Sequence, residues 1–238
     1  MRTLITIPHH STLIPPELKG DFLLEEAQMN RHLDFGTQEL FWLEGHDVLL
    51  AKASRFVVDV NRERDDLAPG QGVIITQTWG NEKVLARDLT AAQIASRLKK
   101  YYDPFYGKLD EKLAGKKPLF VLDAHSMDSK GGFASADAGK KRPQICFATG
   151  KGTISDELLE IFERNFKKAG YKAERNNPYS GARAKIIHYA SARKGVQALE
   201  LEVNKNVYMD EKKFALNAVA VKKFRDTLSK CLEEIEGL

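Results

Sequence analysis

Histidine and acidic residues recur in four short segments of the chain, which are residues 8–11, 59–62, 123–126 and 200–204. His9 and His125 are the natural candidates for metal ligands, because catalytic zinc binds neutral imidazoles and carboxylates and keeps one position open for water. Either histidine alone would be more typical of a structural hydrogen bond. Two histidines near several carboxylates favour a metal centre instead.

A third ligand is needed, and we expect it to be Asp34, which lies on a predicted helix after the His9 segment. Glu25 and Glu26 are weaker candidates. The remaining histidines of this half of the chain are less favoured as ligands. His10 would point away from His9 if the chain is extended there. His32 and His46 are predicted to be ordinary surface residues.

Glu202 is the candidate general base. A carboxylate beside a metal-activated water can take its proton and pass it to a leaving nitrogen. Glu200 shares the same predicted strand face and remains the competing choice. An ion pair is the alternative role for one of the two glutamates.

Arg62 offers a planar guanidinium that suits a substrate carboxylate, and Asn61 can add a hydrogen bond. An ion pair of Arg62 with Asp59 or Asp65 is the alternative. The turn-rich residues 176–181, beginning with Asn176, predict a loop that could border a pocket.

The hydrophobic pattern predicts the elements that position these side chains. Short apolar runs predict strands at residues 4–7, 47–53, 56–60, 118–122, 144–148 and 196–203. Helical patterns occur at residues 31–44, 90–102, 155–169 and 210–235. Gly36 weakens the first helix, Pro104 should break or kink the second, and Thr90 and Ser155 are candidate N-caps.

Strands that alternate with helices predict an α/β fold with a mostly parallel or mixed sheet covered on both faces. Folds of this kind bind ligands at the carboxyl ends of their strands, and the four polar segments fall there. The 238 residues contain no repeat or linker. We therefore expect a single domain over residues 1–238.

Composition narrows the class of protein. The net charge of +4 comes from 37 basic and 33 acidic residues, without the dense basic stripe of a nucleic-acid-binding protein. The apolar run in the opening residues MRTLITIPHHST is too short for the apolar core of a signal peptide, and no run of about 20 apolar residues follows it. Two distant cysteines, Cys146 and Cys231, make no disulfide framework. We expect a cytoplasmic protein with a small-molecule partner and neither a nucleic acid nor a membrane partner.

The chain resembles the N-formylglutamate amidohydrolase family in segments that occur in the family's order along nearly the whole length. Each segment alone is weak, but together they are specific. They are IPHHS at residues 7–11, DVNR at 59–62, DAHSM at 123–127, NNPY at 176–179, HY at 188–189, LEVNK at 201–205 and YMDE at 208–211.

The resemblance implies a three-layer α/β/α fold related to zinc-dependent exopeptidases. It also implies hydrolysis of N-formyl-L-glutamate to formate and L-glutamate. We expect one zinc ion per chain, or another divalent metal, on His9, Asp34 and His125. A more distant likeness to zinc-dependent N-acetylmuramoyl-alanine amidases supports Asp34 as ligand and Glu202 as base.

The resemblance also implies roles for residues around the reacting centre. His188 or Arg62 would steady the oxyanion or the substrate carboxylate, which makes His188 a second catalytic candidate. The predicted substrate-binding residues are Asn61, Arg62, Ser126, Asn176 and Asn204.

Four positions depart from the family pattern. Ser11 replaces a usual Gly, Lys205 replaces a usual Arg, Tyr106 stands where His is common, and Ile187 stands where Arg is common. We therefore expect an intact chemical core and an altered substrate-binding rim, so that the substrate could also be another N-acyl amino acid or small amide. A cell-wall amidase or a non-catalytic binding protein on the same scaffold would also be compatible with these segments.

Overall fold

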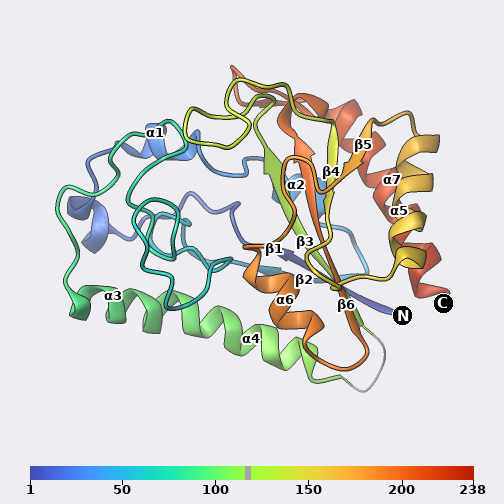
Figure 1. Cartoon of the computed structure of the whole chain (residues 1–238), viewed down its shortest axis with the longest axis horizontal. Helices are drawn as coiled ribbons and strands as arrows, with labels where there is room; N and C mark the ends of the chain where they lie inside the picture. Colours follow the sequence, from blue (N-terminus) through green and yellow to red (C-terminus); the bar gives the residue numbers. More distant parts are fainter. Residues whose placement is uncertain (116–118) are drawn as a thin grey trace.

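Six strands form one sheet: β1 (Arg2–Ile7), β2 (Asp47–Leu50), β3 (Leu119–Met127), β4 (Ile145–Ala148), β5 (Ala173–Arg175) and β6 (Val196–Asn204). The computed structural model describes residues 1–115 and 119–238. Its strand order is β2-β1-β3-β6-β4-β5 (Figure 1). The first four strands of this order are parallel, whereas β4 runs antiparallel to β6 and β5 runs parallel to β4. The α/β fold with a mixed sheet is confirmed.

Helices cover both faces of this sheet (Figure 1). The apolar core on one face includes side chains from α2 (Thr37–Phe41), α5 (Asp156–Lys168) and α7 (Ala218–Glu236). The core on the other face includes side chains from α3 (Ala91–Arg97), α4 (Asp103–Leu113) and α6 (Lys185–Ser191). The shorter elements are a 3-10 helix at Pro16–Asp21, α1 (Glu26–Asn30), a π-helical turn at Leu98–Tyr102, a 3-10 turn at Lys205–Val207, and the hairpin of β7 (Met209–Asp210) and β8 (Ala215–Leu216).

Alternation along β3 and β6 assigns the chemistry to one face. Leu122 on β3 and Leu201 on β6 belong to the core beneath α5 and α7, while Val121 belongs to the core beneath α4 and α6. Because successive strand residues point to opposite faces, Asp123 and His125 continue the face of Val121. Apolar side chains therefore give way to polar ones on the same face as the strand nears its carboxyl end.

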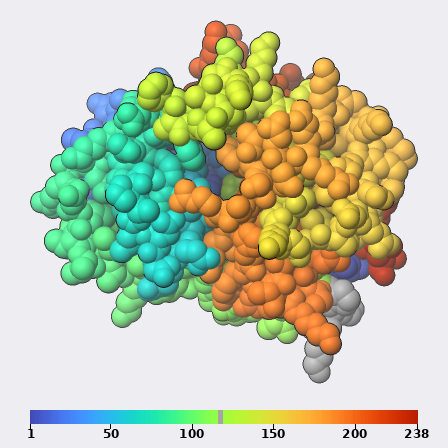
Figure 2. Space-filling view, in the orientation of Figure 1, coloured from blue at the N-terminus to red at the C-terminus, as the bar shows by residue number. Residues whose placement is uncertain are grey.

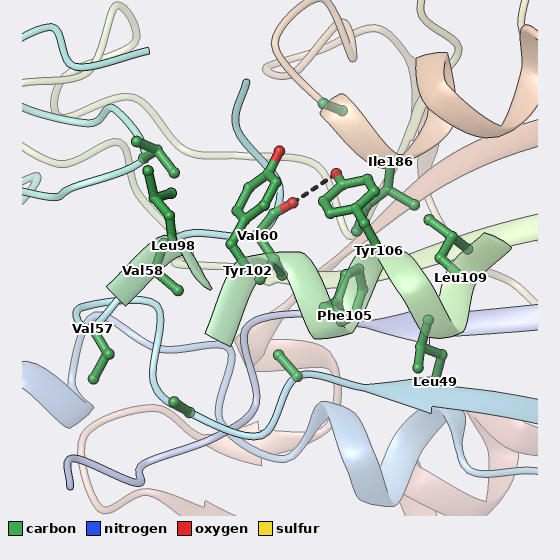
Figure 3. Packing of buried hydrophobic residues seen from close by; sticks show 14 of the residues in the cluster. Leu49, Val57, Val58, Val60, Leu98, Tyr102, Phe105, Tyr106, Leu109 and Ile186 are labelled. Carbon is green, nitrogen blue, oxygen red and sulfur yellow. Dashed lines mark hydrogen bonds between the residues drawn. The ribbon is translucent and has the colours of Figure 1, made fainter. Parts of the chain in front are cut away.

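The π-helical turn and α4 anchor residues 60–62. Tyr102 Oη donates a hydrogen bond to the Arg62 carbonyl at 2.8 Å, and Tyr106 Oη donates to the Val60 carbonyl at 2.8 Å. Figure 3 shows the second bond inside the apolar packing around Phe105. These bonds hold an irregular chain segment against the helical layer beside the sheet.

The predicted strands at 4–7, 144–148 and 196–203 are confirmed, as are the helix at 155–169 and its Ser155 cap. The strand at 47–53 ends early at Leu50, and the one at 118–122 extends to Met127, with Pro118 outside the described residues. Thr90 caps α3 as expected, and Pro104 follows a π-helical turn instead of ending the helix.

The predicted helix at 31–44 is wrong. The chain forms α1 and α2 instead, and Gly36 between them has a φ of 81°. A Cβ at Gly36 would lie 2.7 Å from Leu216 and 2.9 Å from Tyr208, so the close approach of β8 and of the residue just before β7 requires glycine. The break leaves Asp34 in a connection between the helices, where its side chain can face the sheet.

The predicted strand at 56–60 is also wrong, because the segment folds as turns. Asp59 Oδ1 accepts a hydrogen bond from the Asn61 amide at 2.9 Å, a local bond that competes with strand pairing. The predicted helix at 210–235 begins later, at Ala218, where Asn217 caps it. The sequence analysis missed β5, α6 and the β7–β8 hairpin. Among the described residues, no helix combines the length and the apolar character needed to span a bilayer. The single domain over residues 1–238 stays a prediction.

Candidate active site

His9, Asp34 and His125 converge at the carboxyl end of the parallel strands. His9 follows β1, Asp34 lies between α1 and α2, and His125 is near the end of β3. All three are buried, and their ligand atoms lie within 4.8 Å of one another. The Asp34 amide donates to the His9 carbonyl at 3.1 Å, so the backbone itself ties the two segments together.

Both imidazoles turn the same nitrogen toward Asp34. Asp34 Oδ2 lies 2.9 Å from His125 Nδ1 and 3.5 Å from His9 Nδ1. Tetrahedral zinc with bonds of about 2.05 Å would place its ligand atoms about 3.3 Å apart. The donor set and its spacing therefore fit one zinc ion.

The opposite nitrogen of each imidazole meets a second carboxylate. His9 Nε2 lies 2.8 Å from Asp59 Oδ1, and His125 Nε2 lies 3.0 Å from Asp123 Oδ2. A carboxylate behind a ligating histidine fixes the tautomer and ring orientation and raises the basicity of the ligating nitrogen. This arrangement leaves the two Nδ1 atoms free to accept a cation.

These two carboxylates are themselves held by buried donors. Arg55 Nη2 donates to Asp59 Oδ2 at 2.6 Å. Asn61 Nδ2 donates to Asp123 Oδ2 at 2.8 Å, and Thr6 Oγ1 donates to Asp123 Oδ1 at 2.7 Å. Asn61 thus acts as a structural link between the turn at 59–62 and β3, and its Oδ1 also accepts from the Ile186 amide at 2.9 Å.

The charges in this cluster favour a cation. Burial by itself would raise the pKa of Asp34, but hydrogen bonds from His125 and His9 lower it below the usual value. Burial by itself would lower the pKa of His125, but the carboxylates of Asp123 and Asp34 raise it well above its usual value. Without a metal the site holds a proton tightly, and a divalent ion can take the place of that positive charge.

Glu200 and Glu202 extend from β6 on the face of His125. In the register of β3 and β6, Asp123 pairs with Glu200 and His125 pairs with Glu202. Burial raises the pKa of Glu200 to about 7 and that of Glu202 to about 8. Among the described residues, Glu202 Oε2 is buried and has no hydrogen-bond partner. A buried carboxylate left in this state calls for a ligand or ion nearby.

Asp123, His125 and Glu200 form a second group with metal-ligand spacing. Asp123 already accepts hydrogen bonds from Asn61 and Thr6, and Asn61 also lies 3.0 Å from His125 Nε2. These contacts occupy the atoms that this second group would need, so the group with His9 and Asp34 is the better candidate. Glu25 and Glu26 are exposed and do not line the pocket.

The cluster lies in a pocket of about 350 Å³. Figure 2 shows its mouth as a hollow between the cyan, yellow-green and orange surfaces, which belong to the segments that supply Trp79, Gly132 and Pro178–Ala184. Cationic and aromatic side chains surround the glutamates and the cluster. The lining includes Arg55, Asn61, Arg62, Ser126, Arg142, Tyr179, Arg183, Glu200, Glu202 and Lys205.

Three of the predicted substrate-binding residues, Asn61, Arg62 and Ser126, line this pocket. Arg62 donates only to backbone carbonyls, and no described carboxylate lies within ion-pair distance of it. The ion pairs considered with Asp59 and Asp65 do not form. Ser126 Oγ is buried without a hydrogen-bond partner among the described residues. Arg62 thus offers a free polar group to a ligand, whereas Ser126 alternates with His125 along β3 and its hydroxyl lies toward Tyr208.

The remaining three predicted residues lie outside the pocket lining. His188 Nε2 is 3.0 Å from the Gly181 carbonyl, so this side chain supports the pocket wall from behind. Asn176 bonds Thr149, and Asn204 donates to the carbonyls of Arg142 and Pro143. They order the loops that surround the pocket.

Arg55, Arg142 and Tyr179 line the pocket but were not predicted as site residues. Tyr179 lies in the NNPY segment, which could have pointed to it, whereas Arg55 and Arg142 lie outside the segments of the family pattern. His32 was predicted to be an ordinary surface residue, but it is partly buried and lines the pocket, 3.3 Å from Glu82. His46 is also partly buried, against Glu236 of α7. His10 Nε2 bonds the Ala51 carbonyl at 3.1 Å, away from the cluster.

The four departures from the family pattern are not equivalent. Ser11 Oγ donates to the Lys52 carbonyl, Tyr106 bonds Val60, and Ile187 belongs to the apolar core. Among the four, only Lys205 lines the pocket. The expected alteration of the substrate-binding rim is therefore concentrated in one residue.

Comparison with known proteins agrees with this geometry. The chain is 27% identical to the N-formylglutamate deformylase of Pseudomonas aeruginosa over 98% of its length and 91% of the relative. It is 27% identical to that of Pseudomonas putida over 87% of its length and 82% of the relative. Two crystal structures share the fold. One is the N-formylglutamate amidohydrolase of Ralstonia eutropha JMP134 (TM-score 0.83, 23% identity, 98% and 92% of the two chains), and the other is a protein of Agrobacterium tumefaciens (TM-score 0.75, 18% identity, 98% and 91%).

A model of the N-formylglutamate amidohydrolase family matches residues 1–209. The match includes the cluster, both glutamates of β6 and the pocket residues that precede the β7–β8 hairpin. The chain therefore belongs to the N-formylglutamate amidohydrolase family.

Proposed function

We propose that this protein is a metal-dependent amidohydrolase that cleaves N-formyl-L-glutamate to formate and L-glutamate. The observation that carries the proposal is the convergence of His9, Asp34 and His125 in a pocket that also contains the unpartnered carboxylate oxygen of Glu202. The names of the two Pseudomonas relatives support the substrate.

We assign one zinc ion to His9 Nδ1, Asp34 Oδ2 and His125 Nδ1. Bound there, the ion would polarise the amide carbonyl and lower the pKa of a water molecule. Asp59 and Asp123 keep both imidazoles in the tautomer that exposes Nδ1. The chain would thus supply three ligands, and Glu202 lines the same pocket.

Glu202 acts as the general base in this mechanism. Its buried carboxylate takes a proton from the attacking water and delivers it to the amide nitrogen as the carbon–nitrogen bond breaks. Burial raises the pKa of Glu202 in the metal-free protein, and a divalent cation in the same pocket would lower that pKa toward the charged form that a base needs. Glu200, two residues earlier on the same strand face, contributes negative charge beside His125 and Asp123.

Arg62 holds a substrate carboxylate through its guanidinium. Ser126 lines the pocket and stays a predicted substrate-binding residue. Asn61 orients Asp123 and His125 rather than the substrate. We assign positioning roles to His188, through Gly181, and to Asn176 and Asn204, through the loops around residues 142–149.

The test is a metal and substrate series. The metal-free protein, prepared with a chelator, should release no formate from N-formyl-L-glutamate, and one equivalent of zinc should restore the reaction. A panel of N-formyl, N-acetyl and N-succinyl amino acids, with a muropeptide, would separate a formyl amidase from enzymes of different specificity. Cleavage of the muropeptide alone would favour a cell-wall amidase, and zinc binding without any cleavage would favour a binding protein.

Two matched pairs of variants sharpen this test. Glu202→Gln should keep the zinc and lower kcat about 100- to 10,000-fold, the usual contribution of a positioned base, whereas Glu200→Gln should lose much less. His9→Ala should lose zinc, whereas His10→Ala, whose ring bonds Ala51, should retain it. Equal effects within either pair would contradict the assignment.

A further inference from the structure

Five arginine and lysine side chains line the pocket, and they differ in how strongly each is paired with a carboxylate. Four have a carboxylate partner within the described residues: Arg55 with Asp59, Arg142 with Asp137, Arg183 with Asp66, and Lys205 with Asp128. Arg62 has none. A substrate with two carboxylates needs a second anchor besides Arg62, so the strength of each existing pair decides where that anchor can be.

Asp128 is the partner most easily exchanged. Its side chain is 41% exposed, against 24% for Asp66, 19% for Asp137 and 0% for Asp59. Asp137 binds Arg142 through two parallel bonds, and Asp59 also accepts bonds from His9 and Asn61. The only hydrogen bond of the Asp128 carboxylate among the described residues comes from Lys205 Nζ, at 2.6 Å. An exposed, singly bonded counter-ion is weakly held because solvent screens it.

Lys205, in contrast, is fixed in place. Its side chain is 3% exposed and lines the pocket. A buried ammonium needs a negative partner because desolvation without one is costly. If a substrate carboxylate entered the pocket and took over this role, Asp128 could turn to solvent at little cost.

The position of Lys205 suits a substrate side chain. Lys205 follows Glu202 by three residues at the end of β6, so their Cα atoms are separated by up to roughly 10 Å. The side-chain carboxylate of N-formyl-L-glutamate is five bonds from the formyl carbon, roughly 6 Å in an extended form. The remaining distance lies within reach of a lysine side chain. Arg62 comes from the separate turn at 59–62, which leaves it for the other carboxylate.

We propose that Lys205 is the specificity residue for an acidic substrate side chain, and that Asp128 occupies its place until the substrate carboxylate displaces it. This inference rests on the proposed function and names the residue that would recognise the carboxylate side chain of its substrate. Lys205 is also the one departure from the family pattern that reaches the pocket, so the selectivity is expected to depend on this residue.

The experiment measures kcat/KM of the zinc-loaded protein for N-formyl-L-glutamate and N-formyl-L-glutamine. Lys205→Met should lower the ratio of the two values about 10- to 100-fold, mainly through KM for the glutamate substrate. Lys205→Arg should retain most of the ratio. Asp128→Asn should lower KM for N-formyl-L-glutamate several-fold, roughly 3- to 10-fold, because the substrate no longer competes with the internal carboxylate.

Asp66→Asn is the matched control, since it frees Arg183 in the same pocket and changes the net charge equally. An equal fall in KM in this control would show general electrostatics and overturn the proposal. An unchanged substrate ratio in Lys205→Met, with thermal unfolding showing a folded protein, would also overturn it.

Failure of the proposed function would look different, because the wild-type protein would then hydrolyse neither substrate. In that case calorimetric binding of L-glutamate and L-glutamine to the wild-type protein and Lys205→Met decides the anchor. A preference for L-glutamate that disappears in the variant supports it, and equal binding of both amino acids by the wild-type protein refutes it.

Discussion

Replacing Asp59 by asparagine tests whether the acid behind His9 sets the affinity of the metal site. Asp59 is fully buried and accepts bonds from His9 Nε2, Arg55 Nη2 and the Asn61 amide. Burial by itself would raise the pKa of Asp59, but Arg55 and His9 lower it well below its usual value, so the native carboxylate is charged. Asparagine keeps the shape of the side chain and removes that charge.

Two effects of different size should follow. Loss of a carboxylate behind a ligating histidine typically weakens metal binding 10- to 100-fold, which is about 1.4–2.8 kcal/mol. The variant also leaves the buried Arg55 guanidinium without its anionic partner, and breaking such a pair costs about 3–5 kcal/mol. For a chain of this length that cost lowers the Tm by roughly 6–20 °C.

Zinc affinity is measured by competition with a chromophoric chelator, and stability by thermal unfolding of the metal-free protein. Asp103→Asn is the control, because it removes an aspartate that pairs with Arg64 on the surface and should change neither quantity appreciably. A folded Asp59→Asn protein with wild-type Tm and zinc affinity would refute the claim that Asp59 orients His9.

Two further predictions concern pH and backbone. Because burial raises the pKa of Glu202 to about 8 from a usual value of 4.5, its protonated form stabilises the metal-free protein fully below about pH 4.5, and that contribution is lost as the pH rises through 8. The free energy of unfolding of the metal-free wild-type protein should therefore fall more steeply between pH 5 and pH 8 than that of Glu202→Gln, by at most about 1.4 kcal/mol per pH unit, and parallel curves in urea unfolding would contradict this. Gly36→Ala should destabilise the fold by about 2 kcal/mol or more in urea unfolding, because it combines a positive φ with contacts below 3 Å, whereas Gly45→Ala has a similar φ and open space and should cost less. Equal losses in the two variants would show that the contact with Tyr208 and Leu216 is unimportant.

The sequence alone was sufficient for the class of fold, and it pointed to three side chains that the structure groups at the candidate site. Apolar and polar residues alternate along β6, and this alternation predicted both the strand and the shared face of its two glutamates. A hydrophobic pattern that repeats every two residues is typical of a β-strand. His9 and His125 were predicted from residue type and from their place at predicted strand ends, and Asp34 from its place on a predicted helix after the His9 segment. The structure brings the three together. Local patterns succeed where the local preference and the tertiary structure agree.

The irregular segments could not be predicted in this way. Residues 31–44 have a helical pattern, yet contact of Gly36 with Tyr208 and Leu216, distant in sequence, requires a break there. Residues 56–60 are apolar enough for a strand, yet the buried bonds of Asp59 with Arg55 and Asn61 hold them as turns. In both places a long-range contact or a side-chain bond outweighs the propensity of the segment.

Sequence by itself determined which residue types were available for metal chemistry and which strand ends would carry them, since these follow from composition and periodicity. Only the tertiary structure decided how they are used. It placed Asp34 rather than Glu25 or Glu26 beside the histidines, kept His188 behind the pocket wall, and paired the buried Lys205 with an exposed Asp128. Burial and partner distances depend on segments far apart in the chain, and these two quantities set the charge and availability of each group.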